Sequence, residues 1–187
     1  TDALVNGRLQ IAVVDPRFSN TAAKARWWVP IRPGTDAALA LGMIRWIIDN
    51  DRYDAAYLSA PNKEAANDIG ETNFTDATHL VRTDTMRFLL PEDIGLEPAA
   101  AGSAAVVMTD DGPALSTEAS VGRLDYAGTL RGIPVATVFQ LLTDRAREMS
   151  LAEYAETAGI DEDTIVELAD EFTSYGNRAA AELYRGS

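Results

Sequence analysis

The stretch LQIAVVDPRFSNTAAKARWWVPIRPGTDAALA, residues 9–40, decides the fold that the sequence predicts. It opens with an apolar run at residues 9–14, which is rich in β-branched side chains and ends at Asp15-Pro16. Such a run predicts a buried strand, and the proline predicts its end because proline cannot continue a hydrogen-bonded ladder. A short helical segment and then an extended segment at residues 27–31 follow.

A long helix is predicted after the turn Pro33-Gly34-Thr35-Asp36. Residues 37–49 place large apolar side chains on one face at helical spacing, and further apolar residues widen that face. We therefore expect a helix that is buried on several sides. Thr35 or Asp36 is expected to cap its first turn, where free backbone N–H groups need an acceptor.

The rest of the chain alternates short strands and helices. Strands are predicted at residues 77–81, 87–90, 104–108 and 179–184, and helices at 21–26, 54–59, 64–69, 135–146, 151–158 and 163–172. Ser150 and Asp161 are predicted N-caps of the last two helices, and Gly159 is a predicted helix end. Residues 116–130 are polar and irregular. This order predicts an α/β fold: a three-layer, mainly parallel sheet with flanking helices, in a single domain over residues 1–187, with an irregular or hairpin insertion at 91–131.

Composition excludes several classes of protein and of site. The chain has 187 residues, a net charge of −13 and 47% hydrophobic residues, which is typical of a globular protein with a core. The acidic balance argues against a nucleic-acid partner, which needs a basic face. No apolar run reaches the roughly 18 residues of a membrane span. There is no cysteine, and His79 is the single histidine, so thiolate, cluster and multi-histidine metal sites are excluded within this stretch.

Two aspartates stand where a parallel α/β sheet binds ligands. Asp15 follows a predicted strand, and an acidic residue in that place takes ribose hydroxyls in many nucleotide folds; the alternative is a turn residue. Asp36 stands at a predicted helix N-terminus, and its carboxylate could accept two N–H groups from the edge of a guanine. The alternative is a helix cap, which contributes about 1 kcal/mol.

Glycine-rich phosphate loops are missing. Neither G-x-G-x-x-G nor G-x-x-x-x-G-K-[ST] occurs, and a free-standing nucleotide-binding enzyme normally has one of them. A non-catalytic interaction domain, with purely structural turns, is a further alternative. The chain starts at Thr1 and stops just after a strand-like run, so we expect a piece of a longer protein.

The two turns together resemble a known family. Val13-Val14-Asp15-Pro16-Arg17 and residues 28–40 are similar to the catalytic subunits of molybdopterin oxidoreductases of the dimethyl-sulfoxide-reductase type. In that family a strand ends in Asp-Pro-Arg, and a Pro-Gly-Thr-Asp-x-Ala-Leu turn opens a long helix. Residues 132–142 and 159–172 resemble later segments of the family. Within it, residues 43–50, 53–58 and 73–81 look most similar to tetrathionate reductases, with arsenate, thiosulfate and polysulfide reductases as alternatives.

This resemblance implies a cofactor and its binding residues. The cofactor is molybdenum bis(molybdopterin guanine dinucleotide), accompanied in the intact subunit by a [4Fe–4S] cluster whose cysteines lie outside this sequence. By resemblance, Asp15 and Arg17 lie by the nucleotide, and Gly34, Thr35 and Asp36 meet the ribose and guanine. Backbone N–H groups, Arg17 and Arg32 are expected to help carry the phosphates. No residue here is expected to be catalytic or a metal ligand.

The resemblance also implies the setting of the intact enzyme. It would reduce a small inorganic substrate by two electrons, with tetrathionate giving two thiosulfates. Its implied partners are an iron–sulfur electron-transfer subunit, which delivers electrons, and a membrane anchor subunit. Its implied compartment is the periplasm. The chain alone is expected to have no reductase activity, no direct membrane insertion and no nucleic-acid partner.

Overall fold

A computed structural model describes residues 9–97, 105–175 and 180–181. The chain divides into two compact units. The first unit comprises Thr1–Tyr53 and Ala146–Ser187, and the second unit comprises Asp54–Arg145. The single domain and the insertion at residues 91–131 stay predictions.

The first unit begins with a parallel strand pair. β1 (Ala12–Val14) and β2 (Trp27–Val29) pair in the register Ala12↔Trp27 to Val14↔Val29. The short 3-10 helix η1 (Ala22–Lys24) connects them. These elements confirm the strand, helical segment and extended segment predicted between residues 9 and 31. Asp15 prolongs the ladder by donating its N–H to the carbonyl of Val29 at 3.2 Å.

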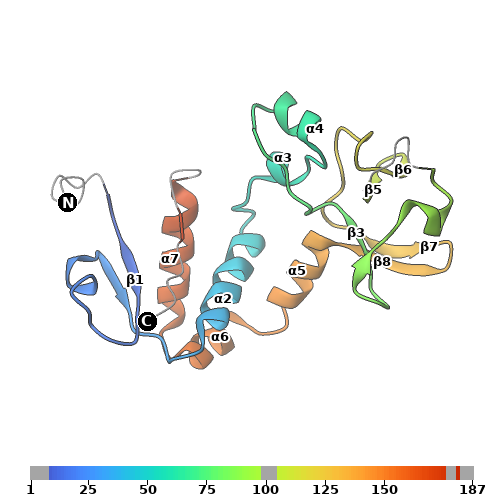
Figure 1. The fold of residues 1–187 in the computed structure, drawn as a ribbon. Coiled ribbons are helices and arrows are strands. Elements are labelled where there is room, and N and C mark those ends of the chain that lie inside the picture. The colour runs from blue at the N-terminus through green and yellow to red at the C-terminus, as the bar shows by residue number, and fades with distance from the viewer. Residues whose placement is uncertain (1–8, 98–104, 176–179, 182–187) are drawn as a thin grey trace. The chain divides into compact units, whose positions relative to one another are not determined.

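Three helices form the rest of this unit. α2 (Asp36–Asp49), α6 (Leu151–Ala158) and α7 (Glu162–Ser174) pack together, as Figure 1 shows, and confirm the helices predicted at residues 37–49, 151–158 and 163–172. Their shared core contains Val29 and Leu39 with Tyr154 and Ile165. Buried apolar area of this kind supplies most of the stability of a helical layer.

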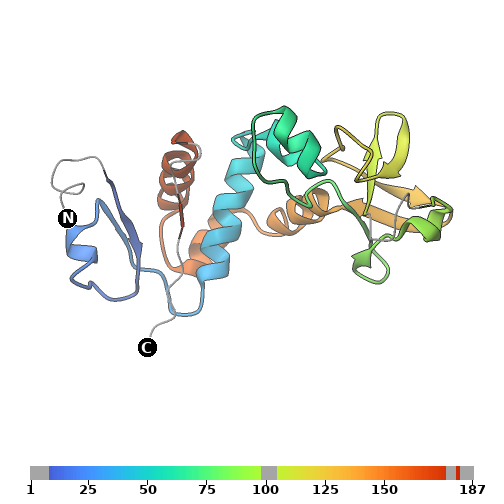
Figure 2. The same cartoon turned by 45° about the horizontal axis from the view of Figure 1, so that its top comes forward.

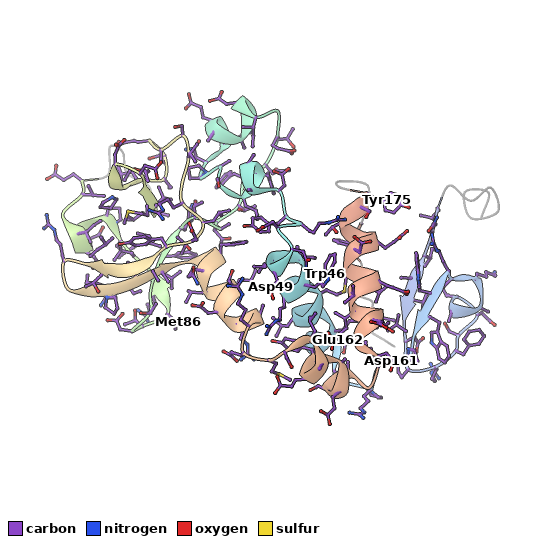
Figure 3. The ribbon with its side chains drawn as sticks, turned by 180° about the vertical axis from the view of Figure 1, so that it is seen from behind. Trp46, Asp49, Met86, Asp161, Glu162 and Tyr175 are labelled. Atoms are coloured by element: carbon purple, nitrogen blue, oxygen red, sulfur yellow. The ribbon has the colours of Figure 1, made fainter. Side chains whose placement is uncertain are left out.

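Ion pairs at the end of α2 support this packing. Asp49, labelled with Trp46 in Figure 3, lies 3.3 Å from Arg45 and 2.8 Å from Arg147. In the same view, Asp161 and Glu162 lie at one end of α7 and Tyr175 at the other. The Asp49 carboxylate thus joins α2 to the chain just before α6.

The helix caps agree with the sequence in position and only partly in chemistry. Ser150 forms a reciprocal capping box with Glu153, and Gly159 ends α6 with φ +75°, as predicted. Thr35 and Asp161 occupy the N-cap positions of α2 and α7, but neither side chain accepts a hydrogen bond from its helix. The prediction of side-chain caps at these two places was wrong; the Thr35 hydroxyl instead donates to the carbonyl of Arg32 at 2.6 Å.

The second unit is built on antiparallel strands. A four-stranded sheet has the order β4-β3-β8-β7, and β5 pairs with β6 in a hairpin that meets β3 through a bridge between His79 and Val107 (Figure 2). The elements are α3 (Ala55–Leu58), α4 (Lys63–Asp68), β3 (Leu80–Arg82), β4 (Arg87–Phe88), η2 (Pro91–Ile94), β5 (Val106–Thr109), β6 (Gly112–Leu115), β7 (Ala127–Leu130), β8 (Ile133–Thr137) and α5 (Val138–Ala146).

The prediction of a three-layer, mainly parallel sheet is corrected by these pairings. Among the described strands, β1 and β2 alone are parallel, and every other pair is antiparallel. The reason is the short connections, since a two-residue turn such as Arg131-Gly132, with φ of +48° and +84°, can join only antiparallel neighbours. The α/β class itself holds.

The stretch from residue 127 to residue 146 differs from the prediction. Residues 127–130 form β7 and residues 133–137 form β8, where we expected an irregular stretch and the start of a helix at residue 135. The helix α5 begins only at Val138. The strand predicted at residues 179–184 lies almost wholly outside the described residues.

Candidate functional site

The carboxyl ends of β1 and β2 form one edge of the first unit. Parallel pairing places both strand ends on the same side, and ligands bind at this side in open α/β sheets. Asp15 follows β1 directly, and residues 30–36 follow β2 and lead into α2. The topology therefore brings Asp15 and Arg17 to the edge at which the loop to Asp36 begins.

Asp15 is held in place and keeps one oxygen free. Its Oδ1 accepts the backbone N–H of Arg17 at 2.8 Å, and its carbonyl accepts the indole N–H of Trp28 at 2.8 Å. No other hydrogen bond reaches this half-buried carboxylate from the residues that the structure describes. The turn role that the sequence left open is thus real, and Oδ2 can still accept a hydroxyl from a ligand.

The loop before α2 exposes its backbone and its acid. Gly34 has φ +80°, and a Cβ built on it would meet no atom within 4 Å. Asp36 is exposed at the start of α2, and its carboxylate makes no hydrogen bond within the described part of the chain. The first N–H groups of a helix lack intrahelical acceptors, so this helix start can bind polar or anionic groups.

The two arginines expected at the phosphates are placed differently. The guanidinium of Arg17 is exposed and has no hydrogen bond or ion pair to any described residue. Arg32 instead donates from Nη1 to the carbonyls of Glu156 at 2.6 Å and Thr157 at 3.4 Å. Arg17 therefore remains available to an anion, whereas Arg32 is engaged with the end of α6.

An exposed aromatic pair lies beside Asp15. The rings of Phe18 and Trp28 meet edge to face, with centroids 5.0 Å apart, and are 63% and 39% exposed. Sequence reasoning did not single out Phe18. Its signal is position, since it follows Asp-Pro-Arg directly at a strand end. The pair adds flat apolar surface beside the free oxygen of Asp15.

Other places in the described structure offer less chemistry. No group of three or more histidine, cysteine or acidic side chains that could hold a metal occurs in these residues. None of their helices is long and apolar enough to cross a membrane. A hollow of about 330 Å³ in the second unit is lined by alanine, serine, isoleucine and valine side chains without a charged group. The edge at Asp15 is therefore the strongest candidate site.

Comparison with known proteins identifies the family. The large selenate reductase chain of Mesobacillus selenatarsenatis is 41% identical over 196 residues and matches the whole of this chain. The corresponding tetrathionate reductase chain of Salmonella typhimurium is 38% identical and matches 98% of it. The chain belongs to the molybdopterin oxidoreductases of the dimethyl-sulfoxide-reductase type. This confirms the resemblance carried by the two turns.

The chain covers a small part of these family members. It spans 18% of the length of the selenate reductase chain and 19% of that of the tetrathionate reductase chain. No protein-family profile matches it. Among solved structures, acetylene hydratase from Pelobacter acetylenicus covers 91% of the chain at 22% identity with a TM-score of 0.45, and the match takes in 13% of that structure.

Proposed function

We propose that this chain holds a guanosine end of a molybdenum bis(molybdopterin guanine dinucleotide) cofactor within the catalytic subunit of a respiratory reductase. The observation that carries the proposal is the edge of β1 and β2, where Asp15 keeps a free oxygen and the adjoining loop exposes Gly34, Thr35 and Asp36. Family membership gives these residues a cofactor to bind.

The donor and acceptor groups at this edge fit a guanosine diphosphate. The Asp15 carboxylate can accept ribose hydroxyls, and the Asp36 carboxylate can accept the N–H groups of a guanine edge. Gly34 has no side chain, so a ligand can approach the backbone closely. Arg17 and the first N–H groups of α2 offer positive charge to phosphates in a chain of net charge −13.

The chain's own part in the reaction is binding and orientation. When bound, the cofactor supplies molybdenum that exchanges two electrons with the substrate. No side chain described here is proposed to act on the substrate, and the molybdenum ligand and the [4Fe–4S] cluster are proposed to lie in other parts of the catalytic subunit. This division agrees with the absence of cysteine from the sequence.

For the intact enzyme we propose reduction of tetrathionate to two thiosulfates. The support is the identity of 38% with the tetrathionate reductase of Salmonella typhimurium and of 35% with that of Archaeoglobus fulgidus. An iron–sulfur subunit, a membrane anchor subunit and a periplasmic location complete the proposal. Selenate is a second candidate substrate because of the 41% identity with a selenate reductase. Arsenate, thiosulfate and polysulfide remain alternatives within the family.

Replacement of Asp36 tests the cofactor site. In the full-length catalytic subunit, Asp36→Asn exchanges an acceptor for an N–H₂ group, and we expect about 10-fold weaker retention of the cofactor, because a bond to a charged group contributes about 1.5–3 kcal/mol. Guanosine monophosphate released by acid hydrolysis and molybdenum per subunit measure this retention. The wild-type preparation, assayed with tetrathionate and selenate, identifies the substrate.

Asp161→Asn is the matched control. Asp161 is also an exposed N-cap aspartate without a side-chain cap bond, but it begins α7. We expect it to retain the cofactor fully. Equal cofactor content in Asp36→Asn and wild type would contradict the proposed site.

A further inference from the structure

Arg32 connects the loop after β2 to the end of α6. Its backbone N–H donates to the carbonyl of Ala158 at 2.7 Å, and its Nη1 donates to the carbonyls of Glu156 and Thr157. These carbonyls belong to the last turn of α6, where helices lack intrahelical donors. A positive guanidinium is also favourable at the negative end of the helix dipole.

The same residue closes the turn that presents Asp36. The carbonyl of Arg32 accepts the N–H of Thr35 at 3.2 Å and its hydroxyl at 2.6 Å. With Pro33 in the second position and Gly34 at φ +80° in the third, this is the arrangement of a type II turn. Thr35 is the N-cap of α2, and Asp36 follows at once.

Gly159 makes room for the Arg32 side chain. A Cβ built on Gly159 would lie 2.8 Å from Cγ and 2.9 Å from Nε of Arg32, closer than real Cβ contacts. The arginine therefore lies directly across the glycine that ends α6. Any larger residue at this position would push the arginine away from the α6 carbonyls.

We propose that Arg32 is a positioning residue, which fixes the turn from Arg32 to Thr35 on α6 so that Thr35 and Asp36 are already placed for the guanosine. The proposal rests on the proposed function, because it names what holds that site in shape. A turn ordered before binding loses less conformational entropy when the ligand arrives. Two other roles make different predictions: a simple helix cap would affect only stability, and a direct phosphate ligand would act through its own charge.

Arg52 offers a matched control for the structural role. It follows α2 as Arg32 precedes it, and it binds α7 through an ion pair with Asp170 at 3.0 Å and hydrogen bonds to Thr173 and Ser174. In the full-length catalytic subunit we expect Arg32→Ala and Arg52→Ala to lower the thermal midpoint of the cofactor-free protein by similar amounts. Only Arg32→Ala should weaken cofactor retention, by about 10-fold, as loss of supporting contacts does at other sites.

Three readouts separate positioning from stability. Activity per bound molybdenum should be unchanged in Arg32→Ala, because positioning alters occupancy and not the chemistry. Arg32→Lys keeps the charge and can reach one carbonyl, so it should restore part of the retention. An equal loss of cofactor in Arg32→Ala and Arg52→Ala would overturn the proposal in favour of a general loss of stability.

Gly159→Ala separates positioning from direct phosphate binding. It leaves the arginine and its charge in place but displaces the side chain, so we expect it to weaken retention as Arg32→Ala does. Gly70→Ala is the control, because Gly70 has a similar φ of +85° and a Cβ added there would meet no atom within 4 Å. Full retention in Gly159→Ala with loss in Arg32→Ala would show a phosphate ligand and overturn the proposal.

The outcomes also separate this inference from the proposed function. If Asp36→Asn loses the cofactor while Arg32→Ala and Gly159→Ala retain it, the site stands and the positioning role fails. If Asp36→Asn and both of these variants retain the cofactor, the proposed site itself fails.

Discussion

At the scale of single residues, Gly42 sets the distance between three helices. It lies inside α2, and a Cβ there would come within 3.1 Å of Ile165 Cδ1 and 3.2 Å of Tyr154 Cβ. Alanine favours a helix over glycine by about 1 kcal/mol, whereas overpacking costs about 1–3 kcal/mol. We expect Gly42→Ala to lower the free energy of unfolding by about 1 kcal/mol, measured by denaturant unfolding, because the overpacking outweighs the propensity.

A second substitution shows whether contact with Ile165 is the cause. Ile165→Val removes Cδ1, the atom nearest to the added methyl group, and by itself costs about 0.5–1.5 kcal/mol. If the clash is the cause, the double variant is less destabilised than the two single effects added together. Additive effects would assign the loss at Gly42 to another contact.

The candidate site could be predicted residue by residue only where its partners are near in sequence. Asp15 and Asp36 stand in recognisable turns, and the structure puts Asp15 in a local turn with the N–H of Arg17 two residues on. Arg32 binds Glu156, which is 124 residues away. Neither periodicity nor turn chemistry carries information about such a contact, so the sequence suggested a phosphate for Arg32 where the structure shows the end of a helix.

At the scale of elements, α6 begins with a charged capping box. The backbone N–H of Ser150 donates to the Glu153 carboxylate at 2.7 Å and its hydroxyl donates at 2.8 Å, and these bonds lower the pKa of Glu153 from its ordinary value of 4.5. A carboxyl group whose folded pKa is lowered stabilises the protein above its unfolded pKa. That contribution is lost as the pH falls through the folded pKa.

Glu153→Gln tests this contribution through its pH dependence. Glutamine keeps the shape but cannot ionise, so wild type should melt at a higher temperature than the variant at pH 7, and the difference should shrink as the pH falls from about 4.5 to about 3. Thermal unfolding followed by circular dichroism measures both proteins. Glu162→Gln, in the first turn of α7 without a capping box, is the control and should show a smaller difference at neutral pH. A difference for Glu153→Gln that stays constant throughout this acid range would contradict the account.

The elements that sequence reasoning missed are those in which two signals conflict. β8 contains Pro134, which argues against a strand with neighbours on both sides, yet β8 lies between β3 and β7. Its last three residues are all buried and run directly into α5, so their apolar pattern suits a helix as well as a strand. β7 is largely exposed and lacks the alternation that marks a half-buried strand. By contrast, α2 and α6 have regular periodicity and turn residues that agree with it.

At the scale of the whole molecule, the two units have separate cores. The first contains Val29, Leu39 and Ile165 from β2, α2 and α7, and the second contains Leu80 and Val106 from β3 and β5. The two clusters share no residue. Since stability comes mainly from such cores, a cavity in one of them should weaken the hydrogen bonds of its own unit first.

Amide hydrogen exchange of two cavity variants tests this separation. Leu80 and Ile165 are both fully buried, and truncation of either to alanine should cost about 2–5 kcal/mol. We expect Leu80→Ala to speed exchange in β3 and β8 and to leave α2 and α7 protected as in wild type, and Ile165→Ala to do the reverse. If either variant lowers protection equally in all four elements, the chain unfolds as one cooperative unit, and the fold that holds the candidate site depends on both cores rather than on its own.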